Sequence, residues 1–440
     1  MLSEFKNIEE LYRLFVQFPF ICTDTRKFIP NSLFFCLKGK NFDGNLLVNE
    51  ALEKGAKYVI TEQSCNDCEK VIVVDDVLKT LQQLANYHRN QLKIPIIGIT
   101  GTNGKTTTKE LIASVLSKKF KTAFTQENLN NHIGVPLTLL SIKKDDEMGV
   151  IEMGANHTGE IEELCKIAQP DFGLITNIGK AHLEGFGTIA NIIETKTALY
   201  RAARVLFVNE KDGVLKQKAE SRKQKAERIY YGKSGHIIEM NPYLVIELFG
   251  NTIQTQLTGN YNLPNILAAA ATGHYFGISN QDICDAISEY APQNQRSQII
   301  KNGTNTIIAD YYNANPASMK VALDNLLQIE APHKLAILGD MLELGENSAS
   351  EHQALIDFCE TNNIEAFFIG TNFFELKNEC FKFFIKVEDC NHYLENNKIQ
   401  DNLILIKGSR GIALENIMFF SNYSTVENIM RSNPTLLPGI

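Results

Sequence analysis

A segment rich in glycine and threonine, GITGTNGKTTTKE, lies at residues 98–110, and its first lysine is followed by three consecutive threonines. Gly101 and Gly104 allow backbone N–H groups to point at phosphate oxygens, and a helix that begins after them adds the positive end of its dipole. In a loop of this kind Lys105 reaches the β and γ phosphates of a nucleotide, and the Thr106 hydroxyl binds Mg²⁺. The segment therefore predicts a nucleotide-phosphate site that works with magnesium.

The segment departs from the strict phosphate-loop signature at one position. The signature has a glycine five places before the glycine of the Gly-Lys pair, and here that residue is Ile99. This change affects the start of the turn and not the part that holds the phosphates. The alternative is a chance glycine- and threonine-rich turn, and the position of GKTT at a strand-to-helix junction argues against it.

Two residues outside the loop are candidate magnesium ligands. Glu152 ends the apolar run MGVIE, and magnesium needs hard oxygen ligands of this type. A buried carboxylate at a strand end is costly unless it is paired or meets a cation, so a helix-capping or ion-paired role is the alternative. His182, in NIGKAHLEGFG, also follows an expected strand, although a lone histidine more often has a structural role.

The sequence around these residues predicts the elements that would position them. From Ile94 onward, apolar strands alternate with helices, which is typical of a mostly parallel sheet. The expected strands are IPIIGIT, MGVIEMG, DFGLITNI and RVLFVN, and NYNLPNILAAAATGHYFG is expected to be a helix. Residues 211–229 are rich in Lys, Glu and Gln and are expected to form an exposed, variable segment.

Two further sections flank this central one. In the first, KYVIT and VIVVDD are expected strands, and the helix after them ends near Leu92. In the last, TIIAD, KLAILGD, AFFIG and LILIKG are four buried strands separated by helices, a pattern typical of a doubly wound α/β domain. We therefore predict an α/β protein of three domains, at residues 1–92, 93–297 and 298–440.

Composition and net charge argue against several classes of protein. The chain is 44% hydrophobic and 21% charged with a formal net charge of −8, which argues against a general nucleic-acid surface. The nine cysteines are scattered as expected for reduced thiols, and the pair Cys65 and Cys68 has no second pair to complete a zinc site. No apolar run approaches the roughly 18 residues of a membrane span, and the first residues have no signal-peptide pattern. We expect a cytoplasmic protein.

Eight motifs in order identify a resemblance that covers about three quarters of the chain. They are GITGTNGKTTTKE, NLNNHIGVPLTLL, IEMGANHTGEI, NIGKAHLEGFG, GNYNLPNILAAAA, DYYNANPAS, LGDMLELGENS and LIKGSRG. Together they resemble the Mur ligases of peptidoglycan synthesis, and within that family the branch that adds a D-alanyl-D-alanine dipeptide. The loop with glycines every third residue resembles that family's own variant of the phosphate loop.

The resemblance implies a fold and an activity. It implies a central P-loop-type ATPase sheet, flanked by an N-terminal UDP-sugar-binding α/β domain and a C-terminal Rossmann-like domain. It also implies that ATP and Mg²⁺ activate the carboxylate of a UDP-muramoyl tripeptide as an acyl phosphate, which the amine of D-alanyl-D-alanine then attacks. Phosphoryl transfer of this kind depends mainly on positioning and charge neutralisation. We expect a monomer whose partners are these small molecules.

The resemblance also assigns roles to individual residues. It implies that Glu152 and His182 help to bind magnesium and that Lys196, in ETKTALY, is the lysine that such ligases carry as a carbamate. From the sequence alone, Lys196 would be an ordinary helix-surface lysine. The residues implied to contact ATP are Gly101, Thr102, Asn103, Gly104, Lys105, Thr106 and Thr107 in the loop, Asn262 and Asn265 at the adenine, and Arg296 and Asp310 at the ribose and phosphates.

Two polar segments are candidate substrate contacts. The stretch TDTRKFIPNSLFFCLKGKNFDGN resembles the family's uridine-binding segment, which makes Thr23, Asp24, Thr25 and Arg26 candidates for the UDP end. The segment NLNNHIG offers Asn130, Asn131 and His132 as contacts to sugar or peptide. An asparagine-rich loop that caps a helix is the alternative for the second segment.

The alternative functions predict sequence motifs that differ from those of this chain. Tripeptide synthetases that add a diaminoacid typically carry DNPR in the last domain, where this chain has YYNANPAS. A GTPase switch would need an NKxD guanine-reading motif, and the nearest string, NKIQ at residues 397–400, lacks the aspartate. The dipeptide-adding ligase is therefore favoured over a diaminoacid-adding ligase and over a nucleotide-gated binding protein.

Overall fold

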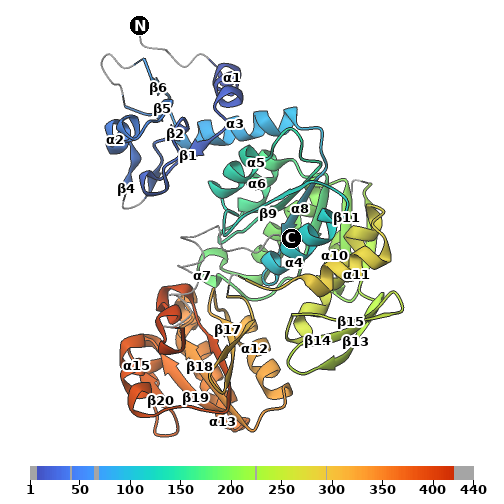
Figure 1. Ribbon diagram of the computed structural model, residues 1–440, viewed down its shortest axis with the longest axis vertical. Helices are drawn as coiled ribbons and strands as arrows, with labels where there is room; N and C mark the ends of the chain where they lie inside the picture. Colours follow the sequence, from blue (N-terminus) through green and yellow to red (C-terminus); the bar gives the residue numbers. More distant parts are fainter. Residues whose placement is uncertain (1–6, 40–41, 64–68, 223–224, 294, 421–440) are drawn as a thin grey trace. The chain divides into compact units, whose positions relative to one another are not determined.

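The computed structural model describes residues 7–39, 42–63, 69–222, 225–293 and 295–420, so Cys65 and Cys68 lie outside the described residues. Its chain divides into two compact bodies, and the colours of Figure 1 follow the residue numbers along the chain. The first body contains the described residues within Met1–Ile178, Ala190–Gly232 and Pro264–Ala286. The second contains the described residues within Gly179–Ile189, Lys233–Leu263 and Ile287–Ile440.

The first body begins with a small parallel sheet in the order β1-β2-β5-β6. Its strands are Ile21–Cys22, Leu33–Phe35, Tyr58–Thr61 and Val71–Val73, and the short β3 (Lys38–Gly39) and β4 (Phe42–Asp43) pair separately. The helices are α1 (Ile8–Gln17), α2 (Val48–Glu53) and α3 (Val77–Gln91). The two strands and the helix predicted for this section are therefore present.

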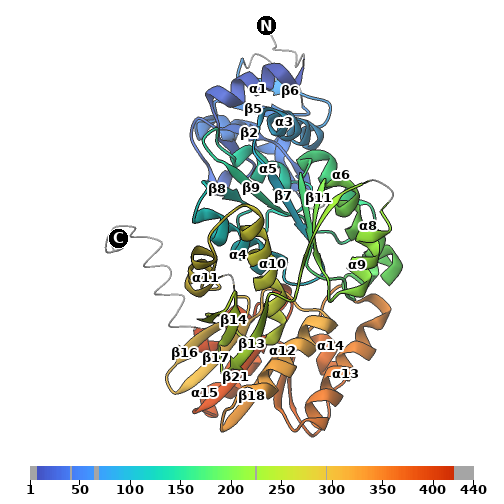
Figure 2. The same ribbon diagram turned by 90° about the vertical axis from the view of Figure 1, so that its right-hand side faces the viewer.

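A six-stranded, all-parallel sheet forms the centre of the first body, and its strands can be followed side by side in Figure 2. The order is β12-β11-β10-β7-β9-β8, with β7 (Ile96–Thr100), β8 (Thr122–Phe124), β9 (Met148–Glu152), β10 (Phe172–Ile175), β11 (Val205–Asn209) and β12 (Glu227–Tyr231). Helices α4 (Lys105–Ser117), α5 (Gly134–Ser141), α6 (Glu160–Ala168), α8 (Ile189–Ala202) and α9 (Gly213–Glu220) connect them. Every residue of β7 and β9 is buried, as a sheet covered on both faces requires.

Strand register brings the expected site residues to one edge of this sheet. Ile99 pairs with Glu152 across β7 and β9, and Thr100 pairs with Ile175 across β7 and β10. The carboxyl ends of the three strands therefore lie together, which is where ligands bind in open α/β sheets.

Most of the described side chains of residues 211–229 are exposed or half-buried, as predicted, and the segment also contains a helix and most of a strand. Much of this segment is ordered: α9 buries Leu215 and Ala219 completely, and β12 pairs in parallel with β11. The polar composition is explained by an amphipathic helix, whose two buried side chains are four residues apart.

The second body contains two sheets. A three-stranded antiparallel sheet is formed by β13 (Gly235–Met240), β14 (Leu244–Leu248) and β15 (Asn251–Gln254), which the sequence analysis did not predict. The larger sheet has the order β16-β17-β21-β18-β19-β20, with strands Gln298–Asn302, Asn305–Asp310, Asn402–Lys407, His333–Gly339, Glu365–Ile369 and Lys382–Phe384. Only β16 runs antiparallel to its neighbour in this sheet.

The helices of the C-terminal part cover the larger sheet on both faces. They are α12 (Pro316–Gln328), α13 (Ser348–Thr361), α14 (Thr371–Glu375) and α15 (Val387–Asn396). One apolar cluster includes Met319 and Ile356, and a second on the other face includes Val387 and Leu394. The remaining helices are α7 (Leu183–Phe186), α10 (Leu263–Tyr275) and α11 (Asn280–Glu289).

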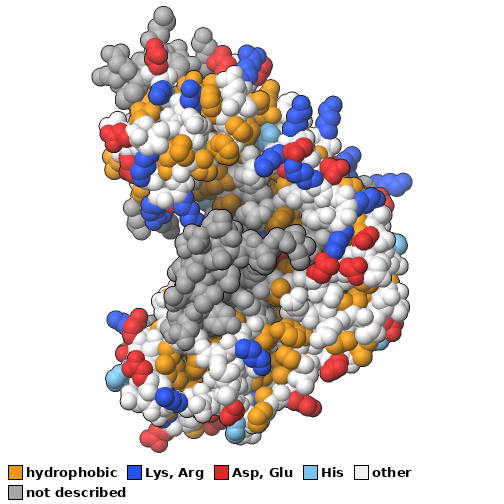
Figure 3. Space-filling model, in the orientation of Figure 1, with side chains coloured by type: hydrophobic (Ala, Val, Ile, Leu, Met, Phe, Trp, Pro, Cys, Tyr) orange, Lys and Arg blue, Asp and Glu red, His pale blue; other side chains and the backbone are white. Residues whose placement is uncertain are grey.

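The surface and the thiols agree with a globular protein. Figure 3 shows acidic and basic side chains interspersed over the face in view, in keeping with a modest formal net charge of −8. Seven cysteines among the described residues are free thiols. In the described part of the chain, no helix combines the length and apolar character needed to cross a bilayer.

Candidate functional site

The glycine-rich loop joins β7 to α4, as the sequence predicts. Gly101 has φ 148°, and a Cβ atom there would lie 1.9 Å from the Thr176 hydroxyl oxygen, so only glycine fits. Gly104, at φ 76°, is the N-cap residue of α4 and provides no side-chain cap for this helix. A helix start without a side-chain cap directs its first N–H groups at whatever lies in front of it, which favours an anion.

The loop is held from the strand beside it. The backbone of Asn177, after β10, accepts a hydrogen bond from Thr102 N at 2.9 Å, and its side-chain oxygen accepts one from Asn103 N at 3.1 Å. The carbonyl oxygen of Asn103 accepts from Thr176 Oγ1 at 2.6 Å and from Asn177 Nδ2 at 2.9 Å. A loop braced in this way is preformed, so little ordering is needed when a phosphate binds.

Lys105 folds back onto its own loop. Its Nζ donates to the carbonyl oxygens of Gly101 at 2.9 Å and Thr102 at 3.0 Å. The ammonium group therefore lies beside the turn in which the phosphates are expected, within the reach of its flexible side chain.

Glu152 and Thr106 form the candidate magnesium pair. Glu152 is 1% exposed at the end of β9, and its Oε2 accepts from Thr106 Oγ1 at 2.9 Å. Its Oε1 accepts from Asn130 Nδ2 at 2.8 Å, and its backbone N donates to Thr125 Oγ1 at 2.9 Å. The hydrogen bonds described for this buried carboxylate come from neutral groups, so a cation beside it would offset its burial.

Lys196 lies against the same loop and is not a surface lysine. It is 2% exposed on α8, and its Nζ donates to the Gly101 carbonyl oxygen at 3.1 Å. Burial, with a smaller contribution from the positive charge of Lys105, lowers the pKa of Lys196 to about 7. At neutral pH a large fraction of this side chain is therefore the uncharged amine, which is the form that reacts with CO₂.

The asparagine-rich loop serves two purposes. Asn131 Oδ1 accepts from the backbone N of Ile133 at 3.0 Å and of Gly134 at 2.9 Å, so this residue caps the start of α5 as the alternative described. Asn130 instead contacts Glu152, and His132 is exposed, with its carbonyl oxygen bound to Gln82 Nε2 at 3.0 Å.

The candidate uridine residues form a short surface turn. Asp24 caps the turn Thr25–Lys27 by accepting from Arg26 N at 2.9 Å, and its carboxylate also pairs with the Arg26 guanidinium at 2.7 Å. This pairing holds the pKa of Asp24 at about 2. Thr25 is buried, and its carbonyl oxygen accepts from Lys54 Nζ at 2.8 Å.

Asn265, in α10, packs against the phosphate loop within the first body. A Cβ atom at Gly104 would lie 2.7 Å from its Oδ1, and Thr108 Oγ1 donates to that same oxygen at 3.1 Å. Asn262 belongs to the second body, where its Nδ2 donates to Thr258 O at 2.8 Å. The two asparagines predicted for adenine are both buried.

In the second body, charged groups gather where β17 and β21 end. Lys407 is 2% exposed and donates to Asp310 Oδ2 at 2.8 Å. Arg296 places its guanidinium carbon 4.0 Å from the centre of the Tyr312 ring, and that of Arg410 lies 5.4 Å from the same ring. Only Arg296 and Asp310 of this group were predicted from the sequence. The motif DYYNANPAS also contains Tyr312, and LIKGSRG contains Lys407 and Arg410.

His182 also belongs to the second body, where its Nδ1 forms a hydrogen bond with Glu343 Oε2. The structure thus brings Thr106, Glu152 and Lys196 together around the loop of the first body. Within the described residues no group of three or more His, Cys, Asp and Glu side chains could hold a metal ion. A hydroxyl, one carboxylate and a modifiable lysine fit Mg²⁺, which commonly takes one or two carboxylates together with substrate phosphates and water.

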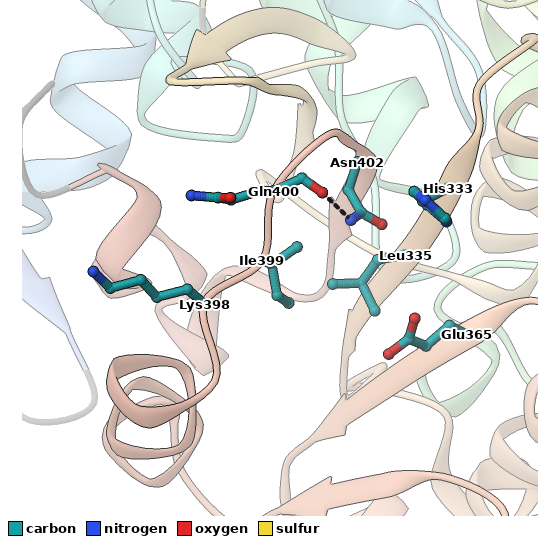
Figure 4. A pocket seen from close by; sticks show the side chains of 7 residues that line it. All are labelled: His333, Leu335, Glu365, Lys398, Ile399, Gln400 and Asn402. Atoms are coloured by element: carbon teal, nitrogen blue, oxygen red, sulfur yellow. Dashed lines mark hydrogen bonds between the residues drawn. The ribbon is translucent and has the colours of Figure 1, made fainter.

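A separate pocket of about 350 Å³ lies at the other edge of the larger sheet of the second body. Figure 4 shows its lining side chains, among them His333, Glu365 and Asn402, which begin β18, β19 and β21. Two of the lining residues are joined by a hydrogen bond, in which Asn402 Nδ2 donates to the Gln400 carbonyl oxygen at 2.7 Å. The amino ends of parallel strands are not where α/β sheets bind their ligands, so this pocket is not the candidate site.

Comparison with known proteins gives consistent matches over nearly the whole chain. Three family descriptions match in succession: "Mur ligase family, catalytic domain" at residues 17–89, "Mur ligase middle domain" at 99–273 and "Mur ligase, glutamate ligase domain" at 295–410. A relative from Bacillus subtilis (strain 168), named UDP-N-acetylmuramoyl-tripeptide–D-alanyl-D-alanine ligase, is 36% identical over 90% of this chain and 92% of its own.

Solved structures agree with these matches. MurF from Acinetobacter baumannii is similar with a TM-score of 0.79 and 30% identity, over 93% of each chain. The MurF ligase from Thermotoga maritima, solved in complex with ADP, is similar with a TM-score of 0.79 and 25% identity, over 93% of this chain and 98% of its own.

Proposed function

Because the chain belongs to the Mur ligase family, we propose that it joins D-alanyl-D-alanine to UDP-N-acetylmuramoyl-tripeptide at the expense of ATP. The product is the UDP-muramoyl pentapeptide used to build peptidoglycan. The observation that carries this proposal is the 36% identity, over nine tenths of both chains, to a ligase named for that reaction. A diaminoacid-adding ligase is not favoured, because relatives of high coverage carry the dipeptide-adding name. We assign the reaction to the cytoplasm, where its nucleotide substrates are made.

The reaction proceeds in two steps with a balanced exchange of groups. A carboxylate oxygen of the tripeptide attacks the γ phosphorus of ATP, ADP leaves, and an acyl phosphate forms. The amine of D-alanyl-D-alanine then attacks the acyl carbon, inorganic phosphate leaves, and the amine gives up a proton to yield the amide. Both steps need negative charge to be held and neutralised more than they need covalent help from side chains.

We assign the binding of the ATP phosphates to the phosphate loop. The first N–H groups of α4 and the Lys105 ammonium bind the β and γ phosphates, with Gly101 and Gly104 keeping the backbone close. This role is supported by the N-cap glycine of α4, which has no side chain to cap the helix, and by the position of Lys105 Nζ, 2.9 Å from the Gly101 carbonyl oxygen. The other loop residues, Thr102, Asn103 and Thr107, line the same turn.

Magnesium, when bound, supplies positive charge at the phosphate oxygens and so lowers the cost of developing negative charge. We assign its protein ligands to Thr106 and Glu152, whose side-chain oxygens are 2.9 Å apart, with His182 as a third. Lys196, as a carbamate, is the fourth. The assignment of Lys196 is supported by its burial beside the loop and by a pKa of about 7, which makes the amine reactive toward CO₂ at cytoplasmic pH.

The remaining predicted residues are assigned to the substrates. Asn262 and Asn265 receive the adenine, and Arg296 and Asp310 contact the ribose and phosphates of ATP. We assign the other residues to the UDP-muramoyl peptide. Those at the uridine end are Thr23, Asp24, Thr25 and Arg26, and those at the sugar or peptide are Asn130, Asn131 and His132.

The deciding experiment is a coupled assay of ADP release with a panel of UDP-muramoyl peptides and acceptors. We expect ADP to form only when a UDP-muramoyl tripeptide and D-alanyl-D-alanine are both present, with equimolar amide product by mass spectrometry. ADP release at the same rate without either substrate would instead indicate a nucleotide-gated binding protein. Faster turnover of a UDP-muramoyl dipeptide with a diaminoacid would indicate the other type of ligase.

A further inference from the structure

The contact between His182 and Glu343 joins two loops that are far apart in the sequence. His182 precedes α7, and Glu343 lies in the loop that follows β18, two residues before the short helix Gly345–Asn347. The two loops also touch elsewhere, because a Cβ atom at Gly345 would lie 3.7 Å from the Cβ of Glu184. Both loops are in the second body, so the hydrogen bond between His182 Nδ1 and Glu343 Oε2 is part of one compact unit.

Both partners have a backbone conformation that is unusual for their residue types. His182 has φ 49° and Glu343 has φ 64°, in the left-handed region that favours glycine. Left-handed residues other than glycine persist where the surrounding structure enforces them, and they concentrate at functional sites. The two residues are joined by one side-chain hydrogen bond.

The loop that carries Glu343 is fixed from three sides. Asp340 is 1% exposed and accepts from the backbone N of Asn372 at 2.9 Å and of Phe373 at 3.0 Å. His352 Nε2 accepts from Met341 N at 3.0 Å. Leu342, which follows Met341, donates its backbone N–H to the Ser409 hydroxyl oxygen at 2.9 Å. The backbone that leads to Glu343 is therefore held in place, although its side chain is 55% exposed.

The chemistry of the contact decides which nitrogen of His182 is available. An ionised carboxylate can only accept, so Nδ1 of His182 carries the hydrogen and Nε2 of the neutral ring keeps its lone pair. A histidine that binds a metal typically donates its other ring N–H to a carboxylate in this manner, which fixes the tautomer and the ring orientation. Glu343 supplies that arrangement for a residue to which we assign a metal-binding role.

We propose that Glu343 is a positioning residue: it holds His182 as the Nδ1–H tautomer and leaves the lone pair of Nε2 to bind a metal ion. This inference rests on the assignment of His182 as a metal ligand. It adds to the reaction a residue from the loop after β18, which the sequence analysis quoted within LGDMLELGENS without giving it a role.

The test compares three variants of Glu343 with a matched control in the same loop. Glu343→Ala removes the carboxylate, Glu343→Gln keeps an oxygen that can accept from Nδ1–H, and Glu343→Gly removes the side chain while relieving the left-handed backbone. Glu346→Ala is the control, because Glu346 is an exposed carboxylate three residues further along the chain. A His182→Gln variant assigns the histidine signal and tests the premise.

Two measurements that do not require turnover report on the contact. Long-range ¹H–¹⁵N NMR of ¹⁵N-histidine-labelled protein without metal, at a pH where the ring is neutral, gives the tautomer of His182. Electron paramagnetic resonance with Mn²⁺ and a non-hydrolysable ATP analogue gives the metal affinity. We expect Glu343→Ala and Glu343→Gly to lose the Nδ1–H signal and to bind Mn²⁺ about 10–100-fold more weakly. Glu343→Gln is expected to retain the tautomer and most of the affinity, and Glu346→Ala to match the parent protein.

Thermal unfolding separates positioning from a merely structural role. Glu343→Gly is expected to be at least as stable as the parent protein, since glycine tolerates φ 64°, and yet to bind Mn²⁺ weakly. Parent-like tautomer and affinity in Glu343→Ala and Glu343→Gly would overturn the proposal. If His182→Gln itself binds Mn²⁺ normally, the metal role of His182 fails. If His182→Gln binds Mn²⁺ weakly while Glu343→Ala binds it normally, only the role of Glu343 fails.

Discussion

Replacing Lys196 by methionine is expected to stabilise the protein while abolishing its activity. Lys196 is 2% exposed, and burial lowers its pKa from 10.5 to about 7. The folded protein therefore disfavours the charged form of this side chain, which the unfolded chain accommodates at no cost. Methionine is similar in length, flexible and uncharged, so it fills the same space without that penalty.

The magnitude follows from the pKa difference. At 1.36 kcal/mol per pKa unit, a pKa of 10.5 in the unfolded chain and about 7 in the folded one costs roughly 4 kcal/mol of stability at pH 7. Losing the hydrogen bond from Nζ to the Gly101 carbonyl oxygen, 3.1 Å long, lowers the stability of the variant by about 1 kcal/mol. The expected net gain for Lys196→Met is about 3 kcal/mol at pH 7.

The pH dependence has a definite sign. Between pH 7 and 10.5 the unfolded chain binds more protons at this lysine than the folded protein does, so the stability of the parent protein rises with pH. The lysine penalty therefore falls to roughly 2 kcal/mol at pH 9, and the advantage of Lys196→Met shrinks accordingly. Below pH 7 the penalty is fully present and nearly constant.

The assay is urea unfolding of both proteins at pH 7 and pH 9 in CO₂-free buffer, so that Lys196 carries a free amine. Lys109→Met is the matched control: Lys109 is 1% exposed, but its Nζ is 3.4 Å from Glu110 and donates to Thr125 O at 2.8 Å. Removing that paired lysine is expected to destabilise the protein by at least ~1 kcal/mol. A Lys196→Met protein that is no more stable than the parent at pH 7, or whose advantage is the same at both pH values, would refute the reasoning.

Three further predictions concern the phosphate loop and its neighbours. Lys105→Ala is expected to lower kcat by at least ~100-fold, the loss typical of a single charge-stabilising donor; near-normal turnover in the ADP-release assay would contradict its phosphate role. Gly101→Ala is expected to abolish binding of an ATP analogue by calorimetry, because the new Cβ atom would lie 1.9 Å from Thr176 Oγ1 and alanine would be strained at φ 148°; parent-like affinity would contradict this reason. Lys196→Ala is expected to be inactive and to regain some activity with added short carboxylates, which take the place of the carbamate; full activity without them would remove Lys196 from the site.

The loop and its strands could be predicted from sequence because their signals are local. The apolar run that becomes β7, the turn glycines and the start of α4 at Lys105 follow one another within a few residues. Glu152 was also predictable, because it ends an apolar run and parallel strands end at a common edge.

Other features depend on contacts that no local pattern contains. The strand β12 is recognisable only through its pairing with β11, and its polar sequence obscured it. The burial of Lys196 depends on the phosphate loop 95 residues earlier, where it meets the Gly101 carbonyl oxygen. The hydrogen bond between His182 and Glu343 joins residues 161 positions apart. Asn131, by contrast, caps a helix within its own segment, which the sequence allowed as an alternative.

The Gly101 carbonyl oxygen connects the two lysines of the site. Lys105 and Lys196 donate to it at 2.9 and 3.1 Å, so two ammonium groups would share one neutral acceptor if both were charged. The charge of Lys105 accordingly contributes to the lowered pKa of Lys196. An anionic phosphate in the turn offers Lys105 a charge-assisted hydrogen bond, which is stronger than its present bonds to carbonyl oxygens. We therefore expect phosphate binding to draw Lys105 away from Gly101 and to leave that carbonyl oxygen to Lys196, so that the proposed nucleotide loop would also keep the second lysine in place.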